Sequence, residues 1–404
     1  MPNTRFAKGR IKLKKGEYIR PNGTFEYKWT DRYGSRHSVY AKTIPELRIK
    51  EDAILKDILD GINSISLNCT INSYFEIWKK IKCGIRDTTF AQYCLNYKCH
   101  IEPEFGLTKL KDITYSKIIL FYKDLVEKHG LSKQSVGNVN IVLRMVLDVA
   151  VKDGVLRTNP CNGAVRGFNR ECSGQVKEVK ALTRDEQDYL EKYLNNPGPY
   201  HWLQPLITVM LYTGMRAGEV CGLRWNDIDF NKKEIHVNHT LVFFGKNDGQ
   251  GKKFALHPPK TRTSDRFIPI GSKVIEALKR QRLLLQNYNS TDYSIDGLSG
   301  FVFLDKDGKV FYHISLNYYL KKISKEINKE LKSNNENTTI KSFPDFHSHM
   351  LRHTFATRMR EAGADIKATA DIMGHTKVNI TLDTYTDASQ SFKRQEISLL
   401  ERID

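Results

Sequence analysis

Six residues in the second half of the chain have side chains that suit chemistry at a phosphate group. They stand in four short segments, far enough apart that only a folded domain could bring them together. Glu219 follows the first of them by three residues. The six candidates are Arg216, Lys260, His349, Arg352, His375 and Tyr385.

These residue types together supply what metal-free cleavage of a phosphodiester requires. Arginine stays charged and binds two phosphate oxygens through its planar fork. Histidine adds donors near neutral pH, and a lysine whose pKa is lowered by its neighbours can protonate the leaving oxygen. A tyrosine hydroxyl has a reference pKa of about 10, so a cationic site must activate it before it attacks phosphorus.

Each residue also has an ordinary structural interpretation. Tyr385 could simply bury area in a core. Arg216 and Glu219 could be an ion pair at the start of a helix, and Lys260 could be one solvated lysine among many. The histidines at 349, 353 and 375 could cap helices or pack inside the protein. Only the whole set of residues, and no single member of it, therefore indicates chemistry.

Taken in order, the four segments resemble the motifs of the tyrosine recombinases, or phage-type integrases. T-G-x-R-x-x-E occupies 213–219, and H-x-x-R-H-T-F-A-T occupies 349–357. Met373-Gly374-His375 is followed by Thr-Leu-Asp-Thr at 381–384 and then Tyr385. The chain is most similar to integrases of conjugative transposons, both in the sequences of its motifs and in its layout of a basic module, a helical module and a catalytic half.

The resemblance implies a role for each residue. Arg216 and Arg352 would clamp the scissile phosphate, and Lys260 would be the general acid toward the 5′ oxygen. His349 and His375 would assist proton transfer, and Glu219 would support the site. Tyr385 would attack and form a 3′-phosphotyrosyl link, so that neither metal, ATP nor another cofactor is needed. Tyr385 lies ten residues after His375, where nine is commoner, and Lys260 has Lys252, Lys253 and Arg262 nearby.

The resemblance also implies partners. Double-stranded DNA would be bound at core-type and arm-type sites, and a homotetramer would assemble on two duplexes. An excisionase or a DNA-bending protein could accompany it. Residues 391–404 could pack on a neighbouring protomer or on their own domain.

Composition fits a polyanionic partner. The chain has 404 residues, with 64 Lys and Arg against 46 Asp and Glu, and a formal net charge of +18. Residues 1–50 hold 13 Lys and Arg against 4 Asp and Glu. An excess of this kind suits nucleic acid. No apolar run approaches a membrane span, no secretory signal is visible, and the seven cysteines form no C-x-x-C pair. We therefore expect reduced thiols and a cytoplasmic protein, and the resemblance further implies a bacterial one that associates with the nucleoid when bound to DNA.

The pattern along the chain predicts a multidomain protein. Residues 1–62 should form a basic module, a three-stranded sheet plus a helix, with strands near 25–29 and 36–40 that interleave aromatic and basic residues. This interleaving favours DNA contact over a merely solvated face, and the resemblance implies binding to arm-type sites. Residues 66–165 should form an all-α bundle, which the resemblance implies is core-binding, with helices at 71–81, 88–97, 116–129 and 133–151. The last helix has Ile141, Leu143, Val146, Leu147 and Ala150 on one apolar face.

A linker is predicted at 166–180, because that stretch lacks a sustained apolar period. The catalytic domain should then occupy 181–404, mainly α with a small antiparallel sheet at 234–238, 253–257 and 266–270. Neither a P-loop nor a G-x-G-x-x-G turn is present, so the sequence does not indicate nucleotide hydrolysis. Two rival interpretations remain: a type IB topoisomerase, which shares this chemistry, and a non-catalytic DNA-binding regulator on the same scaffold.

Overall fold

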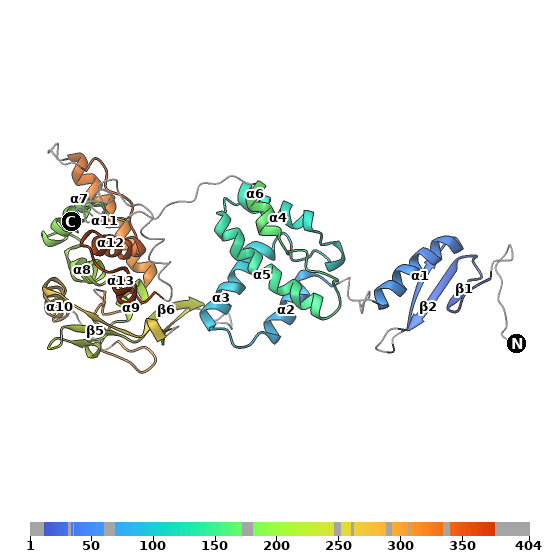
Figure 1. Ribbon diagram of the computed structural model, residues 1–404, viewed down its shortest axis with the longest axis horizontal. Helices are drawn as coiled ribbons and strands as arrows, with labels where there is room; N and C mark the ends of the chain where they lie inside the picture. The colour runs from blue at the N-terminus through green and yellow to red at the C-terminus, as the bar shows by residue number, and fades with distance from the viewer. Residues whose placement is uncertain are drawn as a thin grey trace, which may run out of the picture. The chain divides into compact units, whose positions relative to one another are not determined.

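The computed structural model describes residues 12–30, 34, 36–59, 69–171, 181–245, 252–259, 262–287, 293–305, 307–333 and 340–375. The chain divides into two compact units, residues 1–175 and 176–404. Figure 1 shows the first unit as a small sheet with one helix and a helical bundle, and the second as a mainly helical domain with short strands. These architectures agree with the predicted fold class.

The N-terminal module is an antiparallel sheet with one helix against it. Strands β1 (Glu17–Ile19), β2 (Phe25–Thr30) and β3 (Arg36–Ala41) lie side by side in sequence order, and α1 (Ile44–Leu59) follows them. Tyr27 and Leu47 are buried between sheet and helix, with Phe25 and Trp29 packed around them. Alternate residues of a strand share one face, so the aromatic residues of β2 form the core of the module.

The other face of the sheet pairs basic side chains with exposed rings. Lys28 Nζ lies 5.0 Å from the centroid of the Tyr18 ring, and the Arg20 guanidinium carbon lies 4.6 Å from that of Tyr40. The aromatic residues of β2 thus lie on the core face, and the exposed rings beside the basic residues come from β1 and β3. Contact of this sheet with DNA stays a prediction.

The helical bundle is built around its longest helix. Helix α5 contacts α2, α3, α4 and α6. Thr70, Thr114 and Ser132 accept hydrogen bonds from the first turns of α2, α4 and α5, which satisfies donors that would otherwise be unpaired. The helices are α2 (Ile71–Ile81), α3 (Asp87–Asn96), the π-helical turn η2 (Tyr97–Ile101), the 3₁₀ turn η3 (Leu110–Asp112), α4 (Tyr115–Glu127), α5 (Lys133–Lys152) and α6 (Ala164–Glu171).

Two details of the predicted bundle are wrong. Ile141 is 44% exposed and does not belong to the buried face of α5. The predicted linker also begins too early, because residues 164–171 form α6, and Phe168 is fully buried in the bundle core. The stretch was assigned to a linker because it lacks a sustained apolar period, yet it includes Gly167 at a close helix contact. A Cβ there would lie 2.1 Å from the Tyr115 hydroxyl, so glycine allows α6 to approach α4.

The second unit is organised around α8, which is buried along nearly its whole length and contacts α7, α9, α10 and α12. Its helices are α7 (Arg184–Asn195), α8 (Gln204–Thr213), α9 (Ala217–Gly222), α10 (Ser272–Leu285), α11 (His313–Ser333), α12 (Ser348–Glu361) and α13 (Ile366–Met373). Short 3₁₀ turns are η4 (His201–Leu203), η5 (Trp225–Asp227) and η6 (Arg262–Ser264). In the described part of the chain, none of the helices is long and apolar enough to cross a bilayer.

The strands of this unit form a three-stranded sheet and a separate hairpin. β4 (Ile228–Asp229), β5 (Glu234–Val237) and β8 (Arg266–Pro269) pair antiparallel in that order. β6 (Thr240–Gly245) pairs with β7 (Lys252–His257). The predicted strands correspond to β5, β7 and β8, whereas β6 was not predicted. Its apolar run lacks the alternation that identifies a strand in sequence.

We predict that Phe168→Ala destabilises the bundle by about 3–5 kcal/mol, the usual cost of removing a buried phenylalanine. Hydrogen–deuterium exchange should accelerate in α4 and α6. Leu120→Ala is the matched control, because Leu120 lies on α4 and is 60% exposed. It should change stability by less than about 0.5 kcal/mol. Equal exchange in both variants would contradict the assignment of α6 to the bundle.

Candidate active site

A left-handed turn between two helices positions Arg216. Helix α8 ends at Gly214, whose φ of +62° suits glycine, and Arg216 then serves as the N-cap of α9. The backbone N–H of Arg216 donates to Glu219 Oε2 at 2.8 Å, and its Nη1 donates to Oε1 at 2.8 Å. The T-G-x-R-x-x-E segment is therefore a helix stop followed by a helix start.

Helix α9 lies tightly against strand β6. A Cβ on Gly218 would lie 2.8 Å from the carbonyl oxygen of Leu241, and one on Gly222 would lie 3.0 Å from the Leu241 nitrogen. Two glycines one turn apart thus allow the helix that begins at Arg216 to rest on the hairpin. The chain leaves this hairpin just before Lys260.

Arg352 lies in α12 and joins the ends of two other helices. Its side chain is buried, with only 3% of the residue exposed. Nη1 donates to the carbonyl of Gly214 at 2.6 Å, and Nη2 donates to the carbonyl of Met373 at 2.7 Å. Burial and the nearby Arg216 lower the pKa of Arg352 to about 9, which still leaves it charged at neutral pH.

His375 follows α13 directly and contacts Arg352. Gly374 ends α13 with a φ of +68°, and His375 Nε2 then lies 2.6 Å from Arg352 Nη2. Arginine can only donate, so Nε2 must be the acceptor and the ring must be neutral with its proton on Nδ1. Burial first, and then the charges of Arg352 and Arg216, lower the pKa of His375 to about 4.

His349 stands one helical turn before Arg352 on α12. Residues three apart share a face of a helix, and this histidine is exposed to solvent. Burial of part of its ring, and then the charge of Arg352, lower the pKa of His349 below its ordinary value. The ring centroid of His353 is 6.3 Å away, and partial burial also lowers the pKa of His353.

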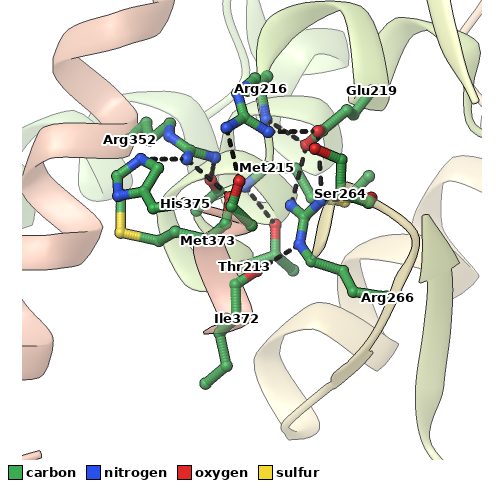
Figure 2. A network of polar contacts seen from close by, with 12 residues as sticks. Thr213, Met215, Arg216, Glu219, Ser264, Arg266, Arg352, Ile372, Met373 and His375 are labelled. Carbon is green, nitrogen blue, oxygen red and sulfur yellow. Dashed lines mark hydrogen bonds and ion pairs between the residues drawn. The ribbon is translucent and has the colours of Figure 1, made fainter. Parts of the chain in front are cut away.

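Glu219 is a buried carboxylate shared by two arginines. Arg266 Nη2 donates to Oε2 at 3.0 Å and Nη1 to Oε1 at 3.2 Å, alongside the contacts of Arg216. Burial alone would raise the pKa of Glu219, but hydrogen bonding and charge from Arg266, and then the charge of Arg216, lower it. Figure 2 shows Arg216 and Arg266 at Glu219, and Arg352 beside His375.

Arg266 was not among the residues selected from sequence, although one signal was available. It opens a predicted strand, and Arg266 and Ile268 are buried while Phe267 is exposed. A charged residue at an inward-facing position of a strand is rarely tolerated without a partner. The partner lies 47 residues earlier in the chain, which no local pattern reveals.

The structure thus brings together Arg216, Glu219, His349, Arg352 and His375. Lys260 and Tyr385 lie outside the described residues and remain predictions. The cluster holds three guanidinium groups but one carboxylate, which pairs with Arg216 and Arg266, so an excess of positive charge remains, and Arg216 keeps 36% of its side chain exposed. Such a cluster suits an anion with several oxygens. In the described ranges, no group of three or more His, Cys, Asp or Glu residues could hold a metal ion.

Three family models match separate stretches of the chain. Residues 180–391 match the phage integrase family, which accounts for just over half of the sequence. Residues 2–58 match the DNA binding domain of Tn916 integrase, and residues 70–126 match the phage integrase N-terminal SAM-like domain. The chain belongs to the phage integrase family. It is therefore a tyrosine recombinase, an enzyme that cleaves and rejoins DNA.

Individual relatives align over the full chain at low identity. A tyrosine recombinase XerC-like protein of Caldanaerobacter subterraneus is 27% identical, over 96% of this chain and 99% of its own length. The transposase of transposon Tn916 from Enterococcus faecalis is 26% identical, over 98% of this chain and 96% of its own. The Tn1549 transposon integrase, solved with transposon right end DNA, superposes with a TM-score of 0.69 at 24% identity. The superposition includes 82% of this recombinase and all of the Tn1549 integrase chain.

We predict that Gly214→Ala destabilises the catalytic unit more than Gly363→Ala does. Both glycines have a positive φ, +62° and +70°, so each alanine costs about 1–2 kcal/mol for the backbone. A Cβ at 214 would also lie 2.4 Å from Phe355 Cδ1, whereas nothing lies within 4 Å at 363. Thermal unfolding midpoints test this. Equal midpoints would show that the contact with Phe355 relaxes freely.

We predict that the unfolding free energy decreases as the pH falls from about 6.5 toward 4, in part through His375. Its folded pKa of about 4 is below the unfolded value. In that interval the unfolded chain binds a proton that the folded chain does not, and acidification therefore favours unfolding. His375→Gln keeps an oxygen that can accept from Arg352 but cannot titrate. Its urea midpoint should fall less steeply with acid, and parallel curves for the two proteins would contradict the assignment.

Proposed function

We propose that this chain is the site-specific recombinase of a mobile element, and that it integrates and excises that element through a 3′-phosphotyrosyl intermediate. The observation that carries the proposal is the convergence of Arg216 and Arg352. Their Nη2 atoms donate to the neighbouring carbonyls of Gly374 and Met373. Two guanidiniums held this close together can share the oxygens of one phosphate.

Each residue has a distinct part in the proposed reaction. Arg216 and Arg352 bind the non-bridging oxygens of the scissile phosphate and stabilise the charge that develops there. Tyr385 Oη attacks phosphorus and forms the bond to the 3′ phosphate, while the bond to the 5′ oxygen breaks. Lys260 gives a proton to that oxygen, which leaves as a hydroxyl. A neutral imidazole, that of His375 or His349, accepts the proton that Tyr385 Oη loses as it attacks.

Religation follows the same path in reverse. The phosphotyrosyl bond conserves the energy of the cleaved linkage, so a 5′ hydroxyl from another strand can attack it and release Tyr385. The chain needs no nucleotide or metal for this exchange. Glu219 supports the step by holding Arg216 at two points, because its carboxylate accepts from the backbone N–H and from Nη1 and so restricts the orientation of the guanidinium.

The accessory modules bind the rest of the DNA site in this proposal. The bundle and the catalytic unit hold the core site, and the N-terminal module binds arm-type sites. The outer face of its sheet offers Arg20 and Lys28 beside exposed tyrosines, which suits contact with DNA. Two sites held by one chain raise its effective concentration at the junction. A homotetramer on two duplexes, with an excisionase or DNA-bending protein as a further partner, completes the assembly.

We predict that Tyr385→Phe forms no covalent complex with a nicked suicide duplex that carries the element end. The wild-type protein should trap that duplex, because the freed 5′ fragment diffuses away before religation. Denaturing gel electrophoresis of labelled DNA measures the adduct, and a mobility shift under native conditions measures binding. The variant should bind as tightly as the wild-type chain.

Tyr318→Phe is the matched control, because Tyr318 is 57% exposed on α11. It should form the adduct at the wild-type rate. An adduct formed by Tyr385→Phe would exclude this nucleophile. Binding without an adduct in the wild-type chain would instead favour a DNA-binding regulator.

A further inference from the structure

We propose that Arg266 is a positioning residue for DNA cleavage: it fixes the turn that carries His375 and ties that turn to Arg216. The proposal rests on the proposed function, in which the 374–385 segment supplies both a proton-exchanging histidine and the nucleophile. Arg266 itself lies too deep to touch DNA, since 7% of its side chain is exposed against 36% for Arg216.

Three arginines from different elements hold three successive carbonyls. Arg266 Nε donates to Ile372 at 2.6 Å, Arg352 Nη2 to Met373 at 2.7 Å, and Arg216 Nη2 to Gly374 at 2.9 Å. These carbonyls lie at the end of α13, where the last groups of a helix lack partners within it. The carbonyl end of a helix is also the negative end of its dipole, so cations bind it favourably.

Arg266 closes this arrangement into a ring of contacts. From the carbonyl of Ile372 the path runs through Arg266 to Glu219, and from Glu219 through Arg216 to the carbonyl of Gly374. The backbone of 372–374 completes the circuit, and Figure 2 shows Arg266, Glu219 and Arg216 with the contacts between them. The turn therefore cannot move relative to Arg216 without breaking at least one charge-assisted hydrogen bond.

The shape of arginine explains why the position needs this residue. Nε donates a hydrogen bond to the Ile372 carbonyl, and both terminal nitrogens donate to the Glu219 carboxylate. Nη1 also donates to the Ser264 carbonyl at 3.2 Å. One planar group thus contacts the 372–374 turn, the α9 carboxylate and the segment that precedes β8. A lysine has a single nitrogen on a flexible stem and cannot hold all three. Gly374 is part of the fit, because a Cβ there would lie 3.0 Å from Arg266 Nη1.

The charge of Arg266 affects a second measurable quantity besides the stability of the fold, the pKa of His375. Burial, Arg352 and Arg216 lower the pKa of His375 most, and Arg266 adds to them. Removing the Arg266 charge should raise the pKa of His375, because one of the cations that oppose protonation is gone. A residue that only stabilised the fold would change unfolding and leave the titration of His375 where it was.

The test compares Arg266→Gln, Arg266→Lys and the control Arg184→Gln in the full-length protein. Arg184 lies in the same unit with 68% of its side chain exposed, and it pairs with Glu361. Single-turnover cleavage of the nicked suicide duplex gives the rate of adduct formation, and its amplitude gives the active fraction. A separate binding titration gives the affinity for the duplex. NMR titration of ¹³C-labelled histidines, with His375 assigned through His375→Gln, gives the pKa without DNA.

We expect Arg266→Gln to cleave about 100-fold more slowly at an unchanged amplitude, the usual order of loss for a misplaced group. Its affinity for the duplex should stay within about threefold, and the pKa of His375 should rise. Arg266→Lys should keep the pKa near the wild-type value and restore only part of the rate. Arg184→Gln should match the wild-type chain in every measurement.

Two results would overturn the proposal. One is a cleavage rate for Arg266→Gln within about threefold of wild type. The other is a lower amplitude with an unchanged rate and an unchanged His375 titration, which would make Arg266 a folding residue only. Failure of the proposed function is distinguishable, because the wild-type chain would then form no adduct although the pKa of His375 still rose in Arg266→Gln.

Discussion

The catalytic unit depends on holding like charges together in a partly buried place. Arg216, Arg266 and Arg352 would repel one another if nothing lay between them, and burial makes that repulsion stronger. Glu219 neutralises part of the charge, and the carbonyls of 214 and 372–374 supply acceptors for the rest. The compensation is incomplete, so the cluster retains a positive excess that an anion can satisfy.

This compensation also explains why helix ends meet at the site. The end of α8, the start of α9 and the end of α13 all present backbone groups without partners in their own helices. Arg352 reaches from the middle of α12 to two of those ends, and Gly214 and Gly374 supply the left-handed turns that expose their carbonyls. The packing of α12 against α8 thus determines where the arginine pair sits.

Local patterns in the sequence were sufficient to locate the residues that form helix boundaries. Gly214, Arg216 and Glu219 mark a stop and a start within six residues, and His349 and Arg352 are spaced to share a helical face, but their roles could be proposed only from the whole set of motifs and its resemblance to a known family. Arg266 could not be placed in the site, because its contacts with Glu219 and Ile372 span 47 and 106 residues. Residues 166–171 were assigned to the linker for a related reason: the close contact between Gly167 and Tyr115 exists only after the bundle folds.

The free site keeps His375 in a defined state. Its Nε2 accepts from Arg352, which excludes a proton on that atom, and the surrounding cations oppose protonation. A phosphate oxygen is a stronger acceptor for the same guanidinium because it carries charge, and its negative charge raises the pKa of nearby histidines. The two effects act in one direction: a phosphate that engages Arg352 competes with His375 for the donor and makes that imidazole a better proton carrier. The arginine cluster therefore links the protonation of His375 to the presence of the phosphate on which it would act.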